Sequence, residues 1–382
     1  MRSYKILIFS WNTQSVSLCE TLNSTLAATN RESYSNYIPK LTTWQYDAEI
    51  PDFYPQFKNL ILINKPDLIV IGFQEDRHPG SYFHSHLLPT EMEKIDFGLV
   101  KRTKMLGFGV TSVKGLKNKD PFRRGLRISV YAKNELIPSI LLEELEMRSA
   151  IGNDGQDEYV CSNITRGKGA VASYVILPGF KRLVFICCHL PFNAQSLIDE
   201  RKFRNPILRQ NELNYSNECF NNIIQELVLF KNPVPTHVVY FGDFNYRLAD
   251  YRSAKVVADE LISNQFDLRY LYDLYQSHDE LLDQMRKHNI YQFFEGTNNL
   301  GPNFLPTCKL KHDRTDNPGQ GTDWWRVGKD DQRVPSWCDR ILYSKVGICN
   351  EDLRCLYYDR FDHGQVMGKS DHAAVTALFE LI

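Results

Sequence analysis

The sequence predicts a layered α/β (α+β) domain, and three observations lead to this prediction. Apolar segments rich in β-branched residues recur along the chain and alternate with stretches of helical periodicity. Of the 382 residues, 43% are hydrophobic and 24% are charged, a composition typical of a globular protein with a large core. The strand-like segments extend over the whole length without a linker, so we expect residues 1–382 to form one domain.

Short apolar runs define the expected strands, because they combine aliphatic, aromatic and β-branched residues between turn-forming segments. These runs are residues 6–9, 68–72, 128–131, 170–177, 183–188, 238–241, 340–343 and 373–379. Apolar residues at helical spacing predict helices in 210–230 and 278–288. Polar stretches rich in glycine and proline predict loops at 31–58, 107–125 and 296–335.

Charge and cysteine usage restrict the compartment and the partners. The net charge is −1, so no global basic field predicts nucleic acid as a partner. The nine cysteines are scattered, and the adjacent pair Cys187 and Cys188 lies in an apolar run, which indicates reduced thiols. The apolar run at 6–9 is too short for a signal peptide, and no run reaches membrane-spanning length. We expect a cytoplasmic monomer that contacts the cytosolic face of membranes transiently.

Polar residues stand at the ends of the expected strands, and as a set they suggest chemistry. Acids, amides and histidines at strand ends that meet at one crevice can hold one divalent cation, one activated water and one anionic group. Each of these residue types is also common at strand ends for ordinary reasons of solvation. The residues are Asn12, Glu75, His189, Asp243, Asn245, Asp371 and His372.

Two longer motifs are more specific. FGDFNYRL (241–248) and RVPSWCDRIL (333–342) resemble the two signature motifs of the inositol polyphosphate 5-phosphatases. SWN (10–12), GFQE (72–75), TRGKGA (165–170), CHL (188–190), PTCK (306–309) and SDHAAV (370–375) are similar to further elements of that family, in the same order. More distantly, the chain resembles the endonuclease/exonuclease/phosphatase superfamily.

The resemblance implies a fold and an activity. The expected fold is a DNase I-like, four-layered α/β/β/α sandwich, in which two mixed β-sheets pack face to face. The expected activity is Mg²⁺-dependent removal of the 5-phosphate from phosphoinositides such as phosphatidylinositol 4,5-bisphosphate, from soluble inositol polyphosphates, or from both. Residues 1–382 would then be a single catalytic domain.

The resemblance also assigns roles to the polar residues. Glu75 would ligate Mg²⁺ with help from Asn12, and Asp243 and Asn245 would hold and activate the attacking water. His189 and His372 would contact the scissile phosphate, and Asp371 would orient His372. Neighbouring side chains diverge in a strand, however, so Asp339 or another acid remains open as the partner of His372. The identity of the general base also remains open.

The substrate side departs from the family pattern. Lys168, Lys309 and Arg333 match the family and are expected to contact phosphates. Arg340 is a fork-shaped donor that either contacts substrate or braces the site through a salt bridge. Three family residues are replaced, and because a charge-assisted contact contributes roughly 1.5–3 kcal/mol, we expect weaker binding of a 4-phosphate. The replacements are Gly167 for asparagine, Cys308 for tyrosine and Asp331 for lysine.

Two further stretches have alternative interpretations. Cys308 and Arg314 match the C-x5-R pattern of cysteine-dependent phosphatases, but the intervening residues lack the glycines that would wrap a phosphate. Residues 114–127 carry six cations against one acid, which suits either an anionic bilayer or a solvated loop.

Two rival functions complete the set of hypotheses. One is another hydrolase of the superfamily, either a nuclease or a sphingomyelinase-type phosphodiesterase, which RVPSWCDRIL and Lys309 disfavour. The other is a catalytically weak phosphoinositide-binding protein, which the presence of every residue of the expected catalytic set disfavours.

Overall fold

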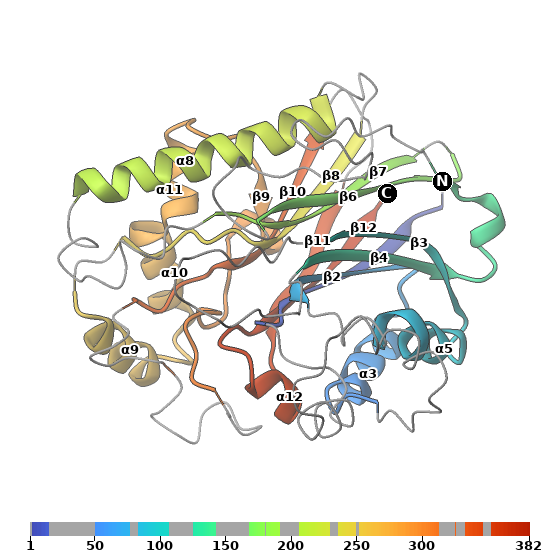
Figure 1. Ribbon diagram of the computed structural model, residues 1–382, viewed down its shortest axis with the longest axis horizontal. Helices are drawn as coiled ribbons and strands as arrows, with labels where there is room; N and C mark the ends of the chain where they lie inside the picture. The colour runs from blue at the N-terminus through green and yellow to red at the C-terminus, as the bar shows by residue number, and fades with distance from the viewer. Residues whose placement is uncertain are drawn as a thin grey trace, which may run out of the picture.

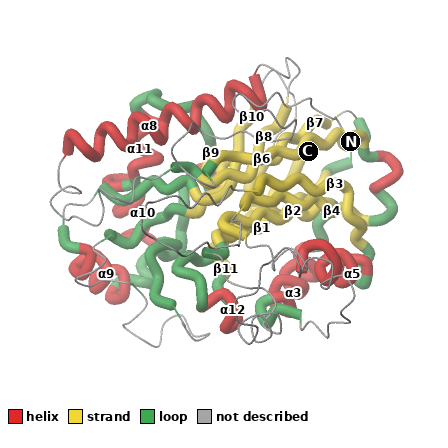
Figure 2. The backbone as a smooth tube through the Cα atoms, viewed as in Figure 1, coloured by secondary structure: helices red, strands yellow, loops and turns green. Residues whose placement is uncertain are grey.

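Two six-stranded β-sheets lie face to face at the centre of the molecule, and helices cover both outer faces (Figures 1 and 2). The computed structural model describes residues 2–14, 50–76, 83–106, 125–142, 168–179, 181–191, 206–229, 236–249, 252–312, 325, 333–346 and 353–382. The first sheet has the order β11-β12-β1-β2-β4-β3, and the second has the order β5-β6-β7-β8-β10-β9.

The strands are β1 (Tyr4–Asn12), β2 (Leu68–Asp76), β3 (Phe97–Leu106), β4 (Gly125–Lys133), β5 (Leu141–Leu142), β6 (Gly169–Leu177), β7 (Lys181–His189), β8 (Thr236–Asp243), β9 (Phe294–Glu295), β10 (Asp339–Val346), β11 (Leu353–Phe361) and β12 (Ala374–Leu381). The α-helices are α3 (Tyr54–Asn64), α5 (Leu88–Glu93), α8 (Pro206–Ile224), α9 (Ala254–Ser263), α10 (Leu268–His278), α11 (Glu280–Arg286) and α12 (Gly364–Gly368). None of the helices in the described ranges is long and apolar enough to span a membrane.

Strand β1 shows how one sheet serves two hydrophobic cores. Successive side chains of a strand point to opposite faces of its sheet. Ile6 and Ile8 lie in the core between the two sheets, whereas Leu7 and Phe9 lie in the outer core that contains Phe57 of α3. The continuous apolar run at the start of the chain is therefore explained by burial on both faces.

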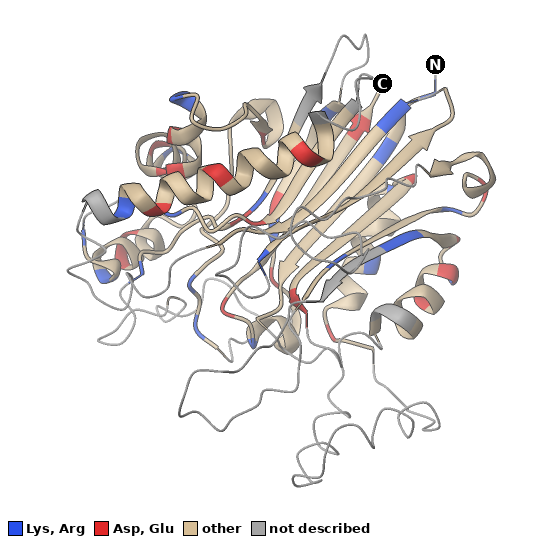
Figure 3. Cartoon of the chain, turned by 45° about the horizontal axis from the view of Figure 1, so that its top comes forward, with Lys and Arg blue, Asp and Glu red and all other residues tan. Residues whose placement is uncertain are grey.

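Strand β8 repeats this pattern in the second sheet. Val239 and Phe241 belong to the core between the sheets, whereas Val238 and Tyr240 pack in the other outer core with Phe220 of α8. The resulting layers are helix, sheet, sheet and helix, so the predicted four-layered sandwich is confirmed. Charged residues are sparse along the middle of the strands and more frequent at their ends (Figure 3).

All eight predicted strands are confirmed, and most extend further than predicted, although β6 gains only Gly169 and β12 begins one residue later than predicted. Four strands were missed: β3, β5, β9 and β11. Three of them have weak sequence signals. β5 and β9 have two residues each, and the edge strand β11 mixes buried with exposed positions. The helices predicted in 210–230 and 278–288 correspond to α8 and α11. The loop predicted at 31–58 ends earlier than predicted, because α3 begins at Tyr54.

Two parallel strand pairs bring the polar strand ends together. β1 runs parallel to β2, and β7 runs parallel to β8, so the carboxyl ends of each pair lie at the same edge of its sheet. The chain termini lie at the opposite end, where Tyr4 of β1 pairs with Leu381 of β12. The register places Asn12 beside Gln74, and His189 beside Asp243. The expected crevice is therefore built by strand register.

The tightest backbone approach at this edge is at Gly242. Gly242 pairs with Cys188 and has a φ of +135°, a conformation that residues with a Cβ rarely adopt. A Cβ added here would lie 2.0 Å from the carbonyl oxygen of Cys188. Glycine is therefore required for β8 to reach Asp243 in its observed position.

We predict that Gly242→Ala destabilises the fold by at least about 3 kcal/mol, because it combines a backbone clash with an unfavourable φ. Urea denaturation followed by circular dichroism measures the change. Gly179→Ala is the matched control, because Gly179 has a φ of +87° with open space around the added atom. It should cost only about 1–2 kcal/mol. Equal effects of the two substitutions would show that the approach to Cys188 is not constraining.

Candidate active site

Asp243 is the centre of the polar cluster at the sheet edge. Strand register places His189 of β7 on one side of Asp243 and Asp339 of β10 on the other. The Nε2 atom of His189 lies 3.2 Å from Oδ2 of Asp243. Asp243 and Asp339, which belong to the two longest motifs of the sequence, are therefore neighbours because their strands pair antiparallel.

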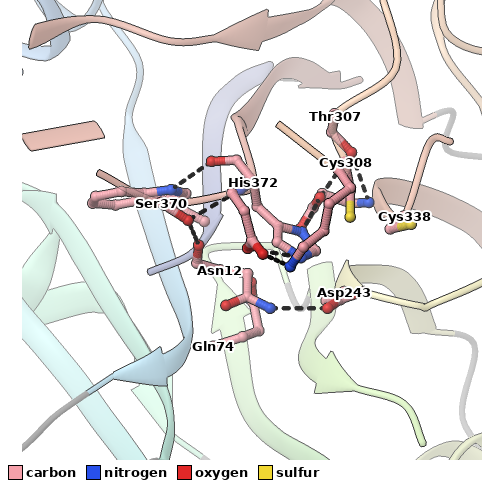
Figure 4. Close-up of polar contacts among 12 residues, drawn as sticks. Asn12, Gln74, Asp243, Thr307, Cys308, Cys338, Ser370 and His372 are labelled. Carbon is pink, nitrogen blue, oxygen red and sulfur yellow. Dashed lines mark hydrogen bonds and ion pairs between the residues drawn. The ribbon is translucent and has the colours of Figure 1, made fainter. Parts of the chain in front are cut away.

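A residue of the other sheet completes the surroundings of Asp243. Asn12 at the end of β1 donates from Nδ2 to Oδ2 of Asp243 at 2.9 Å (Figure 4). The Oδ1 atom of Asn12 accepts from the backbone N–H of Gln14 at 2.9 Å, which orients the amide. The hydrogen bond between Asn12 and Asp243 joins the two sheets at the site.

The segment after β8 holds the Asp243 carboxylate from the other side. The backbone N–H of Asn245 donates to Oδ1 of Asp243 at 3.0 Å, and Asn245 has a φ of +58°, which asparagine tolerates. The Asn245 amide donates to the carbonyl of Leu190 and accepts from Arg247, each at 3.0 Å. Asn245 thus positions Asp243 through its backbone N–H. The predicted contact of Asn245 with the attacking water stays a prediction.

The surroundings of Asp243 keep it ionised. Burial alone would raise the pKa of Asp243, but the hydrogen bond from His189 and the charges of His372 and Lys168 lower this pKa well below its usual range. A buried carboxylate at this position therefore accepts hydrogen bonds at any ordinary pH.

His372 is oriented by Asp339. The Nδ1 atom of His372 lies 2.8 Å from Oδ2 of Asp339, and the hydroxyl of Thr307 donates to the same oxygen at 2.7 Å. Burial opposes a charge on His372, but the charges of Asp339 and Cys308 raise the pKa of His372 well above its usual range. Burial raises the pKa of Asp339 to about 6, although the charge of His372 opposes it.

The role that the resemblance gave to Asp371 is therefore wrong. The Oδ1 atom of Asp371 lies 3.6 Å from Nε2 of His372, which is beyond a normal hydrogen bond. Asp339, the alternative left open by the sequence, makes the short contact. The carboxylate of Asp371 pairs instead with the ammonium group of Lys309.

Sequence reasoning missed the residues that hold the backbone of the SDH segment. The Ser370 hydroxyl donates to the carbonyl of Asn12 at 2.7 Å and accepts from the N–H of His372 at 3.1 Å. The indole N–H of Trp11 donates to the carbonyl of His372 at 3.2 Å. Gln14 accepts from the N–H of Asp371 at 3.0 Å. Only the short motifs SWN and SDHAAV marked these segments.

The cations of the site face its acids and histidines. Lys168, directly before β6, contacts Nε2 of His189. Burial and the charge of Lys168 lower the pKa of His189, so the ring is neutral at pH 7. Lys168 and Arg333 are partly exposed, as is Glu75, so these three side chains lie where a solute would enter. The contacts of Lys168, Lys309 and Arg333 with phosphate stay predictions.

An irregularity in β2 changes the direction of the Glu75 side chain. The pairing of β2 with β4 shifts register between Phe73 and Asp76, and Glu75 has a φ of +53°. Its Oε1 atom lies 3.9 Å from Nε2 of His189. The Glu75 carboxylate therefore lies near His189, whereas Asn12 contacts Asp243 through Nδ2 and its Oδ1 accepts from Gln14. A carboxylate and an amide oxygen fit a hard cation such as Mg²⁺.

A second group of possible metal ligands has a different function. Ligand atoms of Asp243, Asp339 and His372 lie within 4.8 Å of one another. However, Nδ1 of His372 is already hydrogen-bonded to Asp339, and the raised pKa of His372 favours the protonated ring, which cannot ligate a metal. This group is suited to holding a proton beside an anion.

The prediction that Arg340 contacts substrate is wrong. Arg340 is fully buried and forms ion pairs with Asp279 and Glu295, and it donates to the carbonyl of Trp337 at 3.2 Å. Tyr275 and Tyr358 donate to the same Glu295 carboxylate. The bracing alternative therefore holds, with Asp279 and Glu295 as the acids rather than Asp243 or Asp339 of the catalytic cluster.

Arg247 stabilises the site from its buried side. Besides its bond to Asn245, its guanidinium donates to the sulfur of Cys308 at 3.3 Å. Gly167, Asp331 and Arg314 lie outside the described residues, as does most of the basic stretch 114–127. Their predicted contributions stay predictions.

Comparison with known proteins places the chain in a family. Residues 9–378 match the family model described as endonuclease/exonuclease/phosphatase family 2. The chain is 31% identical over 221 residues to type IV inositol polyphosphate 5-phosphatase 11 of Arabidopsis thaliana, which covers 56% of this chain and 52% of that protein. It is 35% identical over 147 residues to inositol-1,4,5-trisphosphate 5-phosphatase 1 of Schizosaccharomyces pombe, covering 38% of this chain and 11% of that protein.

Solved structures share the fold. The inositol polyphosphate 5-phosphatase domain of a synaptojanin, in complex with inositol (1,4)-bisphosphate and calcium, matches with a TM-score of 0.58 and 21% identity, covering 99% of this chain and 84% of that one. A nitrophorin from Cimex matches with a TM-score of 0.54 and 14% identity, covering 99% of this chain and 98% of that one. Likeness at these identities concerns the fold alone.

The chain belongs to the endonuclease/exonuclease/phosphatase family. Its relatives in sequence are inositol polyphosphate 5-phosphatases, so the resemblance drawn from the motifs is confirmed. The matched region spans about half of the length of the Arabidopsis type IV protein and 26% of a second Arabidopsis relative, a type I enzyme.

The buried position of Arg340 leads to a stability prediction. Arg340→Met leaves Asp279 and Glu295 buried without their cation, so we expect a loss of about 3–5 kcal/mol in the free energy of unfolding. Arg269→Met is the control, because the Arg269 side chain is 90% exposed and should lose less than about 1 kcal/mol. Unchanged stability of the Arg340 variant would contradict the bracing role.

The Asp339–His372 contact leads to a spectroscopic prediction. Asp339→Asn should lower the pKa of His372 to its ordinary range or below, because burial is then no longer offset by the carboxylate charge. Nitrogen-15 NMR titration of the histidine rings measures this pKa. Asp371→Asn is the matched control and should shift this pKa less, and a larger shift in that variant would restore Asp371 as the orienting acid.

Proposed function

We propose that the chain is a Mg²⁺-dependent 5-phosphatase of inositol polyphosphates and phosphoinositides. The observation that carries this proposal is a buried Asp243, held by Asn12 and His189, that lies beside the Asp339–His372 pair. The pKa of Asp243 is lowered and that of His372 is raised. An anion acceptor for a water and a cation for a phosphate thus lie side by side. The relatives named as inositol polyphosphate 5-phosphatases support the choice of substrate class.

Asp243 would orient the attacking water. It is an ionised acceptor whose position is fixed by the N–H groups of Asn12 and Asn245. A base far below the operating pH removes a proton inefficiently, so the lowered pKa of Asp243 suits orientation of the water better than complete proton removal. In phosphoryl transfer, positioning and charge stabilisation supply most of the catalysis.

His372 would stabilise the phosphate. As an imidazolium ion fixed by Asp339, it presents the Nε2–H to an anion. Lys168 adds a second positive charge beside the neutral ring of His189. Together these groups neutralise negative charge that the phosphate carries in the ground state and in the transition state.

Glu75 and Asn12 are the residues that would hold Mg²⁺. When bound, the ion would supply charge neutralisation at the phosphate and would lower the pKa of a coordinated water. The partly exposed Glu75 carboxylate provides the anionic ligand, and the oriented amide of Asn12 keeps a second lone pair on Oδ1.

The pocket for the neighbouring phosphate differs from the family pattern. Lys309 is present, but Asp371 pairs with it, and Cys308 stands where the family has a tyrosine. Binding of a 4-phosphate would therefore require Lys309 to turn from Asp371 toward the ligand.

We infer a protein that works in the cytoplasm and contacts membranes transiently through the basic stretch 114–127.

One assay tests the proposed function. Phosphate release is measured from inositol 1,4,5-trisphosphate and from vesicles that contain phosphatidylinositol 4,5-bisphosphate. Cleavage of single- and double-stranded DNA is measured in parallel. We expect turnover of the inositol substrates with Mg²⁺ and none with EDTA. Cleavage of DNA without inositol phosphate turnover would indicate a nuclease, and binding of vesicles without any turnover would indicate a binding protein.

Asp243→Asn tests the assigned centre of catalysis. We predict a decrease in kcat of about 10²–10⁴-fold with little change in thermal stability, because the amide keeps the shape but loses the anionic acceptor. Asp273→Asn is the control, since the Asp273 side chain is 66% exposed on α10 and should leave kcat unchanged. Near-normal kcat in folded Asp243→Asn protein would show that another group orients the water.

A further inference from the structure

Two cysteines lie directly beneath the proposed site. Cys308 and Cys338 are both fully buried. The thiol of Cys338 donates to the carbonyl of Tyr246 at 3.5 Å, and the two thiols lie close enough for each to shift the pKa of the other. Figure 4 shows both side chains beside the ring of His372. The proposed hydrolysis uses neither sulfur.

The backbone fixes the two segments side by side. Cys308 forms a bridge with Ser336, in which the N–H of Cys308 donates to the carbonyl of Ser336 at 3.1 Å and the N–H of Ser336 donates in return at 2.6 Å. Cys338 follows two residues later. A disulfide requires neighbouring backbone segments, and this pairing brings the segments of Cys308 and Cys338 together.

From this arrangement we propose that Cys308 and Cys338 form a reversible disulfide on oxidation by a hydroperoxide, and that the disulfide stops turnover at the proposed site. The inactivation part of this proposal rests on the proposed function, whereas the formation of the bond does not.

The charges around Cys308 favour it as the attacking sulfur. The guanidinium of Arg247 donates to its sulfur at 3.3 Å. Burial opposes ionisation, but the hydrogen bond from Cys338 and the charges of His372 and Arg247 lower the pKa of Cys308. Burial and the neighbouring Cys308 raise the pKa of Cys338, which therefore keeps its proton.

The chemistry balances with the hydroperoxide as the only co-reactant. The Cys308 thiolate attacks the hydroxyl oxygen of the peroxide, so that an S–O bond forms, the O–O bond breaks, and an alkoxide, or hydroxide from hydrogen peroxide, leaves and takes up a proton. The sulfur of Cys338 then attacks the sulfenic sulfur of Cys308, and its proton leaves with the hydroxyl group as water. The two sulfurs lose two electrons, and the peroxide is reduced to water and an alcohol, or to two waters from hydrogen peroxide.

The bond would act on the site through two adjacent residues. Cys308 directly precedes Lys309, and Cys338 directly precedes Asp339, which orients His372. Drawing the two sulfurs together also withdraws Cys308 from Arg247 and His372. A displacement of about 1 Å in catalytic groups can lower turnover by about 10²-fold, so this change suffices to inactivate the enzyme.

Other buried thiols of the described chain are poorer candidates. Burial raises the pKa of Cys187 and of Cys355 to about 12, so these thiols stay protonated and react slowly. His372, which interacts with Cys308, keeps 6% of its surface exposed, whereas both thiols are fully buried. A small hydroperoxide is therefore the class of oxidant that fits.

The test treats the full chain with hydrogen peroxide, blocks remaining thiols with an alkylating agent and maps tryptic peptides by mass spectrometry. Trypsin should place Cys308 in peptide 288–309 and Cys338 in peptide 334–340. We expect these two peptides to be cross-linked after oxidation and separate after treatment with dithiothreitol. Phosphate release should fall at least about tenfold and recover with dithiothreitol.

Variants distinguish this pair from general oxidation. Cys338→Ala should show no cross-link and should accumulate sulfenic acid on Cys308, which dimedone traps. Cys355→Ala is the control and should keep both the cross-link and the reversible inactivation of the unmodified protein.

The absence of the 288–309 to 334–340 cross-link in oxidised protein with all its cysteines would overturn the proposal. This result does not depend on the substrate or on the folding of any variant. A cross-link that forms while phosphate release continues unchanged would reject the regulatory part. An oxidised protein with the cross-link, and a reduced protein without turnover of any inositol substrate, would reject the proposed function instead.

Discussion

The negative charge of Asp243 is buried at the edge where the two sheets meet, and the rest of the site follows from it. A buried carboxylate remains ionised only if hydrogen bonds and positive charges replace the water that it loses. Asn12 supplies a donor from one sheet, Asn245 supplies a backbone N–H from the turn after β8, and His189 lies beside it in the second sheet. The face-to-face packing of the sheets is therefore also what assembles the site.

The second constraint is the proton on His372. Asp339 is held by Thr307 and lies next to Arg340, whose buried ion pairs with Asp279 and Glu295 anchor the start of β10. Structural and chemical roles thus alternate along one motif: Cys338 is buried, Asp339 orients a histidine, and Arg340 anchors the strand. The RVPSWCDRIL motif has a distinctive sequence because each of these positions has a different physical requirement.

The sequence predicted the layers and most of the site, for identifiable reasons. Strands buried on both faces produce apolar runs, and parallel pairing brings their polar ends together, so Asn12, Glu75, His189 and Asp243 could be recognised. The errors concern side-chain partners. Asp371 was assigned by resemblance and Arg340 by the shape of its guanidinium, but strand register places Asp339 opposite Asp243, and Arg340 pairs with Asp279 and Glu295. Register of this kind depends on which strands pair, and a single sequence does not contain that information.

The central claim concerns which bond is broken, and phosphorus-31 NMR of the reaction products tests it most directly. With inositol 1,4,5-trisphosphate and Mg²⁺, the account predicts inorganic phosphate and inositol 1,4-bisphosphate as the initial products, with the resonances of the 1- and 4-phosphates retained. Initial loss of the 1- or the 4-phosphate, or no release of phosphate from an inositol ring by folded protein with Mg²⁺, would contradict it.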